Sequence, residues 1–307
     1  MLFDLIIIGG GPAGMTAGIY GARQKIKTLL ITKDFGGQVA KKAVAVENYP
    51  GFEKISGIEL IEKFKKQLQR YEIDIEKDEV IKVRKVKDSF FVLTSNKKEF
   101  EAKTIIIASG ADPRPLEVPG EKEFIGKGLS YCAVCDGSLF PDKTVVIVGG
   151  GNSGFETALF LSNIVKKIYI LEYGSEVKAD KESQTVIKET GKVQIITNAA
   201  LKEIKGDKFV NSIIYQDRET KKEQVLDVEG VFVEIGYQPT TSFVKGLVDF
   251  NEQDEIKVEF ETCQTKTPGL FAAGDVNVGR FKQITTACGE GTKAALAAFN
   301  YLKRLKK

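Results

Sequence analysis

Short apolar runs lead into a glycine-rich loop twice along the chain, and a helix-like pattern and a second apolar run follow each loop. The segments are 5–8, 13–23 and 27–32 in the first half, and 144–148, 153–163 and 167–172 in the second. Strand–loop–helix–strand units of this kind predict a parallel sheet with crossover helices. The first-order expectation is therefore an α/β fold.

The two halves continue in the same way. Alternating polar and apolar residues predict a meander of short strands over 79–101 and again over 199–228. Each half then closes with an apolar strand that ends in glycine, at 104–110 and 231–236. The two glycine loops begin 140 residues apart, so the chain looks internally duplicated.

Proline and glycine collect after each closing strand, at 112–115 and 236–239. Residues 244–307 match neither repeat, and such a tail usually returns to complete the first domain. We therefore expect two Rossmann-like dinucleotide-binding domains, the second inserted in the first. Each is expected to be a three-layer ββα-type sandwich with a small β-meander. The expected boundaries are 1–112 and 244–307 for the outer domain and 115–243 for the inserted one.

Composition narrows the class of protein. The 45 basic and 42 acidic residues are interspersed, with no run of mixed aromatic and basic residues, so nucleic acid is not an expected partner. No segment approaches 18 consecutive apolar residues, and no basic leader precedes the strand at 2–8. A cytoplasmic protein without membrane contact is expected. Histidine is absent, which removes the commonest general base and metal ligand.

Both glycine loops follow an apolar strand and open a helix, as a dinucleotide-binding loop requires. The first glycine makes the turn, the second lets backbone N–H groups approach a pyrophosphate, and the third allows close packing of helix on strand. The residues predicted to contact the two nucleotides are Gly9, Gly11, Pro12, Ala13 and Gly14 in the first loop, and Gly149, Gly151, Asn152, Ser153 and Gly154 in the second.

The strand after the second loop ends in Glu172, 23 residues after Gly149. A carboxylate there accepts hydrogen bonds from a ribose 2′-hydroxyl and repels a 2′-phosphate. No arginine lies between residues 149 and 183, and Lys178 is the nearest following cation. The pattern predicts a preference for NADH over NADPH of about a hundredfold or more. Gly236, which ends the closing strand, is assigned to the same site.

The first loop lacks such an acidic residue, because the strand after it ends in Thr32. A threonine hydroxyl can still meet a ribose hydroxyl, but the dinucleotide fingerprint is weaker here. Further along, an apolar strand over 267–273 ends in Gly274 and Asp275. This arrangement presents a carboxylate and backbone N–H groups to a polyhydroxylated chain at the edge of the sheet.

Cys132 and Cys135 form a Cys-x-x-Cys pair between the two loops, which indicates redox or metal chemistry in a reducing compartment. A zinc site is disfavoured, because Cys263 and Cys288 form no second pair and are expected to be buried small residues. A dithiol between two nucleotide sites predicts a relay from a nucleotide, through a second cofactor, to a disulfide. Asp136 is the candidate general acid–base for a leaving thiolate, although a carboxylate there also suits a helix cap.

Taken together, these motifs resemble those of low-molecular-weight thioredoxin reductases and of the C-terminal part of the alkyl hydroperoxide reductase flavoprotein subunit, across essentially the whole chain. The further matching stretches are Gly36–Gln38, Glu47–Gly51, Thr104–Ala111, Gly269–Asp275 and Lys282–Ile284. The resemblance implies FAD in the outer domain, and a nicotinamide nucleotide and the dithiol in the inserted one. It also implies a homodimer and a thioredoxin-fold partner whose disulfide is reduced.

The resemblance further implies roles for single residues. Asp275 would bind the ribitol or pyrophosphate of FAD, and Gln283 would contact the isoalloxazine edge. Cys135 would be the thiol nearer the flavin, and Cys132 the thiol that attacks the partner. The other residues assigned to FAD, with Thr32, are Gly36, Gly37, Gln38, Asn48, Ala108, Gly110, Gly274, Lys282 and Ile284.

One stretch departs from the thioredoxin reductase pattern. Relatives that prefer NADPH carry a His-Arg-Arg motif and a further Arg where this chain has residues 172–174 and Lys178. Here the chain is closer to the alkyl hydroperoxide reductase flavoprotein, which uses NADH. The expected function is an NADH-driven, FAD-dependent reductase of thioredoxin or a glutaredoxin-like protein. The alternatives are a reductase feeding a glutaredoxin-like carrier and peroxiredoxin, a ferredoxin-type reductase without nicotinamide, and a non-catalytic redox sensor.

Overall fold

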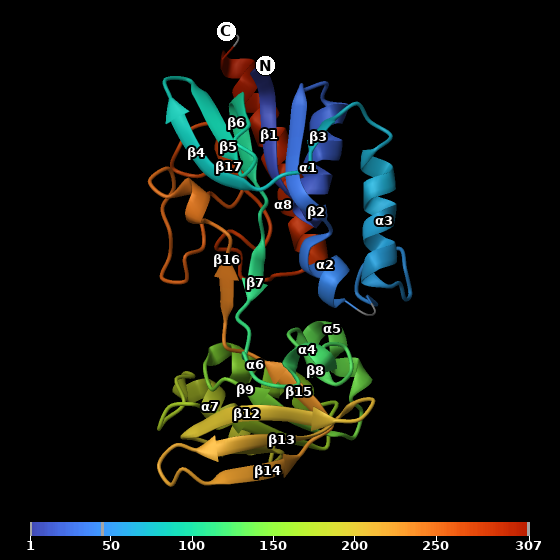
Figure 1. Cartoon of the computed structure of the whole chain (residues 1–307), viewed down its shortest axis with the longest axis vertical. Helices are drawn as coiled ribbons and strands as arrows, with labels where there is room; N and C mark the ends of the chain where they lie inside the picture. Colours follow the sequence, from blue (N-terminus) through green and yellow to red (C-terminus); the bar gives the residue numbers. More distant parts are fainter. Residues whose placement is uncertain (1, 44–45, 306–307) are drawn as a thin grey trace. The chain divides into compact units, whose positions relative to one another are not determined.

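The structure, a computed structural model, describes residues 2–43 and 46–305. The chain divides into two compact units, unit 1 (Met1–Asp112 with Tyr237–Lys307) and unit 2 (Pro113–Gly236). Figure 1 shows that the chain leaves unit 1 after β6 and returns to it before β17. The predicted fold class, with two Rossmann-like regions and the second inserted in the first, is confirmed. None of the described helices is long and apolar enough to span a membrane.

Unit 1 is built on one sheet with helices packed against it. Its elements, with the two connecting strands, are β1 (Leu2–Gly10), α1 (Pro12–Arg23), β2 (Thr28–Phe35), α2 (Gly37–Lys42), α3 (Gly57–Leu68), β3 (Asp74–Glu76), β4 (Val80–Val86), β5 (Ser89–Thr94), β6 (Glu99–Ile107), β7 (Ala111–Pro113), β16 (Tyr237–Pro239), η2 (Ser242–Val244), β17 (Leu270–Ala272) and α8 (Ile284–Leu305). The strand order is β3-β2-β1-β6-β5-β4, with β17 also paired to β6.

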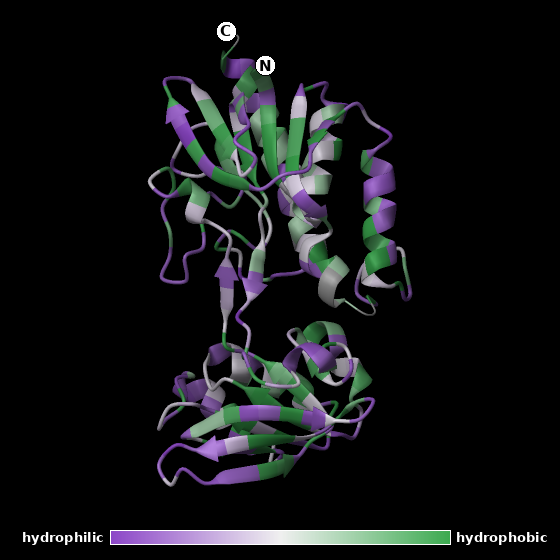
Figure 2. Ribbon diagram, in the orientation of Figure 1, coloured by the Kyte–Doolittle hydropathy of each residue, from purple (hydrophilic) through white to green (hydrophobic). Residues whose placement is uncertain are grey.

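The centre of this sheet is parallel and buried on both faces. In β1, Leu5 and Ile7 belong to the core cluster that contains residues of α1 and α8, whereas Ile6 and Ile8 belong to the cluster that contains Phe90 of β5. A parallel strand covered on both sides reads as a continuous apolar run, which is why this segment shows no alternation. Figure 2 shows the corresponding hydrophobic colouring of the central strands.

The returning segment completes unit 1. β17 extends the sheet as a parallel partner of β6, with Leu270 beside Ile105. Helix α8 packs closely on α1, because a Cβ added at Gly291 would lie 2.2 Å from the Ala13 carbonyl oxygen. Lys303 and Arg304 lie in its last turn, where cations suit the negative end of the helix dipole.

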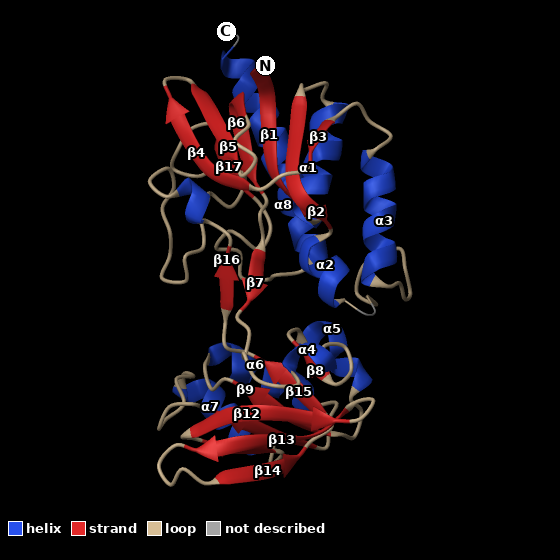
Figure 3. Ribbon diagram, in the orientation of Figure 1, coloured by secondary structure: helices blue, strands red, loops and turns tan. Residues whose placement is uncertain are grey.

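Unit 2 repeats the β–loop–α–β plan. Its elements are α4 (Glu121–Phe124), β8 (Leu129–Ser130), α5 (Ala133–Asp136), η1 (Gly137–Leu139), β9 (Thr144–Val148), α6 (Asn152–Ser162), β10 (Lys167–Leu171), α7 (Lys181–Glu189), β11 (Val193–Ile196), β12 (Ala199–Gly206), β13 (Val210–Asp217), β14 (Glu223–Asp227) and β15 (Gly230–Val233). A parallel sheet has the order β11-β10-β9-β15-β8, and β12-β13-β14 form an antiparallel sheet (Figure 3).

Two features differ from the sequence-based expectation. The meander of unit 1 is continuous with the main sheet through β6, whereas that of unit 2 is a separate sheet. Residues 237–243, expected with the inserted domain, group with unit 1. The physical reason is local hydrogen bonding, since Thr240 N donates to Gly110 O (3.1 Å) and Ser109 Oγ donates to Thr240 O (2.7 Å).

Candidate active site

The first glycine loop joins β1 to α1 in a tight turn. Gly9 has φ +113°, and a Cβ there would lie 2.2 Å from the Ala108 carbonyl oxygen. A Cβ at Gly14 would lie 1.9 Å from the Gly9 carbonyl oxygen. Side chains at these two positions are excluded by the backbone itself, so the turn and the helix–strand packing both require glycine.

The second loop, between β9 and α6, has the same geometry. Gly149 has φ +122°, and a Cβ there would lie 2.3 Å from the Glu234 carbonyl oxygen. A Cβ at Gly154 would lie 2.0 Å from the Gly149 carbonyl oxygen. The internal duplication predicted from the sequence therefore extends to the backbone contacts of the two glycine loops.

The middle glycine of each loop is different, because its surroundings are open. No heavy atom lies within 4 Å of a Cβ built at Gly11 or Gly151. These residues are the N-caps of α1 and α6, and neither helix has a side-chain cap, whereas Ser56 caps α3 and Asp180 caps α7. Uncapped N–H groups at a positive helix end, beside open space, fit a pyrophosphate at each loop.

Alanine at these two open positions is expected to separate the two sites. Gly11→Ala should weaken FAD binding, and Gly151→Ala nicotinamide nucleotide binding, by about 10- to 100-fold, because an extra methyl group in a packed contact costs about 1–3 kcal/mol. Both backbones are extended (φ −76° and −85°), so alanine introduces no strain. Flavin content and nucleotide titration calorimetry measure the two effects.

Each of these variants is the control for the other. The free energy of unfolding of both apoproteins should stay within about 0.5 kcal/mol of that of the unaltered chain, because the added methyl group meets no protein atom at either position. A variant that loses both ligands, or neither, would contradict the assignment of one nucleotide to each loop.

Glu172 lies directly after β10, and its side chain binds the backbone of the second glycine loop. Its Oε2 accepts a hydrogen bond from Gly150 N (2.8 Å), and its Oε1 accepts one from Gly174 N (2.7 Å). A carboxylate has further lone pairs, so these bonds fix its direction without exhausting its acceptors. The predicted ribose ligand therefore also anchors the glycine loop.

The neighbourhood of Glu172 contains a cation that the sequence analysis missed. The Arg218 guanidinium stacks 3.9 Å above the ring of Tyr173, which is 62% exposed, and Arg218 Nη1 donates to Tyr173 O (2.9 Å). Arg218 N also donates to Asn198 O, and Asn198 N donates to Gly174 O (2.7 Å each). Because Arg218 belongs to a hairpin 45 residues further on, no local motif signals it.

The remaining residues predicted for the second nucleotide lie around the same loop. Lys178 N donates to Gly150 O (2.9 Å), and Asn152 Oδ1 accepts from Asp180 N (2.9 Å). Ser153 is exposed at the start of α6, and Gly236 is an exposed residue with φ +94° shortly after β15. The carboxyl edge of the unit 2 sheet thus gathers these residues, as parallel strands dictate.

In unit 1 the fold brings together predicted flavin residues from opposite ends of the chain. Asn48 Nδ2 donates to Gln283 Oε1 (3.3 Å), across 235 residues of sequence. The Gln38 amide donates to Ala111 O, and the Thr32 hydroxyl donates to Asp34 O. The hydrogen bond between Asn48 and Gln283 therefore orients the two side-chain amides toward each other within unit 1.

Several other predicted flavin residues are glycines in turns or buried apolar residues. Gly36 and Gly37 have positive φ and begin α2, and Ile284 begins α8. The rest of these residues are Gly110 and Gly274, both with positive φ, and Ala108, which is buried.

Asp275 is a largely buried carboxyl group next to β17. Burial raises its pKa to about 6, and the Lys282 ammonium acts in the opposite direction. Lys282 Nζ is itself paired with Glu255 Oε1 (2.8 Å). Glu290 was also missed by the sequence analysis, and its Oε2 accepts from Gly274 N and from Asn277 Nδ2 (2.7 Å each).

Cys132 and Cys135 form a disulfide in unit 2. Cys135 N donates to Cys132 Sγ (3.2 Å), a contact that favours negative charge on this sulfur once the pair is reduced. The helix that follows Cys132 is only the four-residue α5, followed by η1. A single N–H bond, rather than a long helix dipole, is therefore the local influence on this thiol.

Asp136 follows the pair and is held by a residue that the sequence analysis missed. Ser130 Oγ donates to Asp136 Oδ2 (2.5 Å), and Cys132 N donates to Ser130 Oγ (3.0 Å). Burial raises the pKa of Asp136, and the Ser130 hydrogen bond offsets part of that effect. A carboxyl that keeps its proton beyond the usual pH range is suited to protonating a leaving thiolate.

The other two cysteines are not paired. Cys263 is buried and Cys288 is partly buried, as expected for small residues in a core. Burial raises the pKa of Cys263 to about 12, which keeps this thiol protonated and unreactive.

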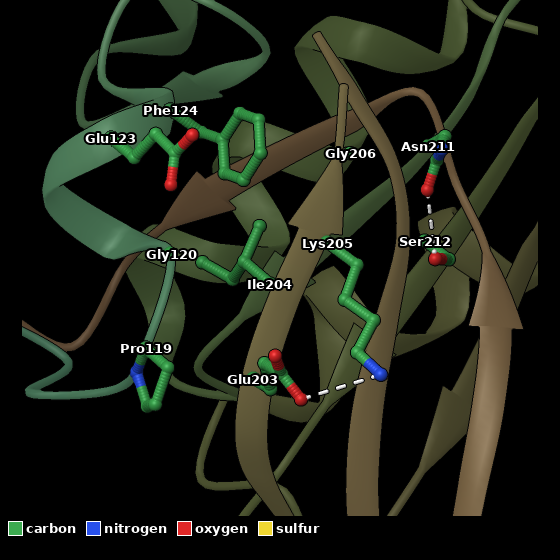
Figure 4. Close-up of a pocket in the computed structure, with 10 residues that line it drawn as sticks. All are labelled: Pro119, Gly120, Glu123, Phe124, Glu203, Ile204, Lys205, Gly206, Asn211 and Ser212. Atoms are coloured by element: carbon green, nitrogen blue, oxygen red, sulfur yellow. Dashed lines mark hydrogen bonds and ion pairs between the residues drawn. The ribbon is translucent and has the colours of Figure 1, made fainter. Parts of the chain in front are cut away.

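Unit 2 also contains an open groove of about 520 Å³ beside α4, β12 and β13 (Figure 4). Its lining residues are Pro119, Gly120, Glu123, Phe124, Glu203, Ile204, Lys205, Gly206, Asn211 and Ser212. Lys205 pairs with Glu203 (3.4 Å), and Ser212 with Asn211 (2.9 Å). None of these residues belongs to the predicted site.

Two glycine loops, a disulfide with a partly buried aspartate, and a glutamate at a strand end agree with a comparison against protein families. The model of the pyridine nucleotide-disulphide oxidoreductases matches residues 3–291. The chain belongs to this family. Membership makes it an oxidoreductase, and the family implies FAD and a nicotinamide nucleotide as cofactors.

Curated relatives of this oxidoreductase include the NADH dehydrogenase of Bacillus subtilis strain 168, which is 41% identical over 302 residues. An alkyl hydroperoxide reductase component of Pseudomonas aeruginosa is 39% identical over 307 residues. Both alignments cover 98% of the chain, but only 59% and 58% of the respective relatives. The chain therefore spans less than two thirds of the length of these curated relatives.

Solved structures match this oxidoreductase over their whole length. Thioredoxin reductase from Streptococcus pyogenes has a TM-score of 0.93 at 37% identity, covering 99% of both chains. Thioredoxin reductase from Giardia duodenalis has a TM-score of 0.93 at 33% identity, covering 98% of this chain and 99% of that one. The fold is that of thioredoxin reductases.

Proposed function

We propose that the chain passes electrons from NADH, through FAD, to the Cys132–Cys135 pair and on to a disulfide of a thioredoxin-fold protein. The observation that carries this proposal is the Cys132–Cys135 disulfide, with the partly buried acid Asp136 beside it, in the same unit as the glycine loop whose Gly150 N–H is bound by Glu172. The relatives named NADH dehydrogenase and thioredoxin reductase support the donor and the type of acceptor.

Each unit would hold one cofactor. The residues proposed to bind FAD are those of the first loop with Thr32, Gly36, Gly37, Gln38, Asn48, Ala108, Gly110, Gly274, Asp275, Lys282, Gln283 and Ile284. The residues proposed to bind the nicotinamide nucleotide are those of the second loop with Glu172, Lys178 and Gly236. When bound, FAD supplies the conversion of a hydride into a pair of electrons that a disulfide accepts.

The chemistry at the dithiol is thiol–disulfide exchange. The Cys132 thiolate attacks a sulfur of the partner's disulfide, forming a mixed disulfide and expelling one partner thiolate. Cys135 then attacks the Cys132 sulfur, which releases the second partner thiolate and restores the Cys132–Cys135 bond. Asp136 donates a proton to one departing thiolate, and the proton that the Cys135 thiol loses on attack goes to the other. The partner therefore gains two electrons and two protons in all.

Replacing Asp136 with asparagine is expected to lower kcat/KM for the protein disulfide by about 100-fold, the usual contribution of one general acid. Because the raised pKa keeps Asp136 protonated to a higher pH than usual, the rate should fall as pH rises through that pKa. The variant should lack this fall. Ser130→Ala should move the fall to higher pH, because the Ser130 bond lowers the pKa.

Steady-state assays over a range of pH from acidic to alkaline measure these effects. Asp207→Asn, at an exposed aspartate of the same unit, is the control and should match the unaltered chain. A pH profile of Asp136→Asn that superimposes on that of the unaltered chain would assign Asp136 a purely structural role.

The donor is tested by anaerobic titration of the flavoprotein with NADH and, separately, with NADPH, following flavin absorbance. Rapid bleaching by NADH supports the proposal. Bleaching by neither nucleotide would contradict it and favour a ferredoxin-type donor. Turnover with any disulfide partner would exclude a purely sensory role.

A second candidate function is an NADH-driven reductase that feeds a peroxide-scavenging system through a separate glutaredoxin-like carrier. The relatives named as alkyl hydroperoxide reductase components, of which this chain spans less than two thirds, favour it. Rates with purified thioredoxins and glutaredoxin-like proteins separate the two candidates. For either function we propose that the protein is a homodimer in the cytoplasm, and light scattering measures its oligomeric state.

A further inference from the structure

A partly buried acid that the proposed relay does not use lies beside the second glycine loop. Glu234 directly follows β15 and is partly buried, and its Oε1 accepts a hydrogen bond from Thr157 Oγ1 of α6 (2.7 Å). Burial raises the pKa of Glu234 to about 7; the Thr157 bond acts against this, and the Glu156 charge adds to it. Removing a carboxyl group from water costs free energy, so its presence at this position requires an explanation.

Glu234 is in contact with the loop itself. Its backbone N donates to Val148 O (2.8 Å), and its carbonyl oxygen would lie 2.3 Å from a Cβ at Gly149. Its side chain points to the α6 face of the sheet, the same face as Phe232, two residues earlier. The acid therefore lies at the carboxyl edge of β15, between the loop and the helix that the loop opens.

The sheet topology tells which part of a dinucleotide reaches this place. In the order β11-β10-β9-β15-β8, the strand sequence reverses between β9 and β15, and dinucleotides lie across such a switch point. Glu172 marks the adenosine side, at the end of β10, and the uncapped start of α6 marks the pyrophosphate. The remaining half of the nucleotide must extend toward β15, where Glu234 lies.

One oxygen of this carboxyl group is open toward that half. Among residues 2–43 and 46–305, the only hydrogen bond to the Glu234 side chain is the one from Thr157 to Oε1. No buried side-chain nitrogen or oxygen atom in this part of the chain lacks a partner. Because Oε2 has no partner among these residues, it is not sealed in the interior and remains available to a ligand.

We propose that Glu234 binds the carboxamide of the nicotinamide ring through Oε2, and that Thr157 positions the carboxyl group by holding Oε1. A carboxamide offers two N–H donors and one carbonyl acceptor. An ionised Glu234 accepts from the N–H, and a protonated one donates to the carbonyl, so the match holds in both states. The inference rests on the proposed function in one respect, that a pyridine nucleotide occupies the second loop.

The experiment compares two ligands that differ only at the nicotinamide. Titration calorimetry on the intact flavoprotein gives Kd for NAD⁺ and for ADP-ribose, which lacks that ring. Glu234→Ala should raise Kd for NAD⁺ about tenfold, the value of one good polar contact, and leave Kd for ADP-ribose within about twofold. Glu234→Gln, which keeps an acceptor and a donor, should bind NAD⁺ nearly as well as the unaltered chain.

Further variants make the result specific to this contact. Thr157→Val keeps the shape of the side chain but loses the donor, so it should raise Kd for NAD⁺ by a smaller factor and spare ADP-ribose. Glu189→Gln, at an exposed acid of the same unit, is the matched control. Flavin absorbance and circular dichroism check that each variant is folded.

The outcomes are distinct. If Glu234→Ala weakens the binding of NAD⁺ and of ADP-ribose equally, Glu234 only supports the loop. If it weakens the binding of neither, Glu234 contacts neither ligand. Both results overturn the inference while the proposed function stands. An unaltered chain that binds neither ligand would instead overturn the proposed function, and the inference with it. Should NADP⁺ bind more tightly, the same comparison with 2′-phospho-ADP-ribose applies.

Discussion

Replacing Cys135 with serine is expected to reduce turnover of a protein disulfide by at least about a thousandfold, because the two cysteines act as one unit and losing either abolishes the exchange. Cys132 remains able to attack the partner, but no thiol is left to resolve the mixed disulfide. The variant should therefore accumulate a covalent one-to-one complex with the partner. A non-reducing gel detects this complex, and the coupled oxidation of NADH gives the turnover rate.

Two controls sharpen this result. Cys132→Ser should be equally inactive but form no such complex, because the attacking thiol is missing. Cys288→Ser removes a thiol outside the pair, and its turnover should stay within about twofold, as for most substitutions away from the chemistry. In both variants of the pair NADH should still bleach the flavin. Turnover of Cys135→Ser at the unaltered rate would refute the relay.

The second large effect concerns the nucleotide. Flavin reduction should be about a hundredfold or more faster with NADH than with NADPH at limiting concentration, because a 2′-phosphate meets the Glu172 carboxylate in place of two charged hydrogen bonds. Glu172 is fixed for this role by the N–H groups of Gly150 and Gly174. Anaerobic stopped-flow measurements give kcat/KM for each nucleotide.

The variant that tests Glu172 is judged by the ratio of kcat/KM for NADH to kcat/KM for NADPH. Glu172→Gln places an amide where both loop N–H groups need an acceptor, so binding of either nucleotide should weaken. The charge repulsion disappears, however, and the preference for NADH should fall to about tenfold or less. Glu176→Gln, at an exposed acid in the same segment, should keep the full preference. Equal rates with both nucleotides in the unaltered chain would refute the assignment.

The parts of this site that the sequence predicts are those with local causes. The third glycine of each loop is required by a backbone contact five residues away, Gly14 against Gly9 and Gly154 against Gly149, and a spacing pattern records this requirement. The strand-end position of Glu172 is equally local. The apolar runs of β1 and β9 are read correctly because strands buried on both faces are continuously hydrophobic.

The parts that the sequence does not predict depend on distant partners. Glu234 lies in an apolar segment that reads as an ordinary strand, and only the fold brings Thr157, 77 residues away, to its carboxyl group. Arg218 likewise reaches Tyr173 from a separate hairpin. Ser130 is the exception, because its partner Asp136 is only six residues away and no motif marks the pair. Long-range side-chain contacts leave no periodic signal, so these residues are found only in three dimensions.

The insertion of unit 2 between the two segments of unit 1 sets an order of assembly. During synthesis all strands of unit 2 leave the ribosome before β17 and α8, which the unit 1 sheet and helix layer need. Domains fold as units, and pairing across a long separation is slow. Unit 2, which carries the thiols, is thus expected to fold first. If Gly9–Gly14, Asp275 and Gln283 bind FAD as proposed, the loop cannot bind it until the other two residues have been synthesised. On this assignment, flavin binding is expected to be the last step in the formation of the holoprotein.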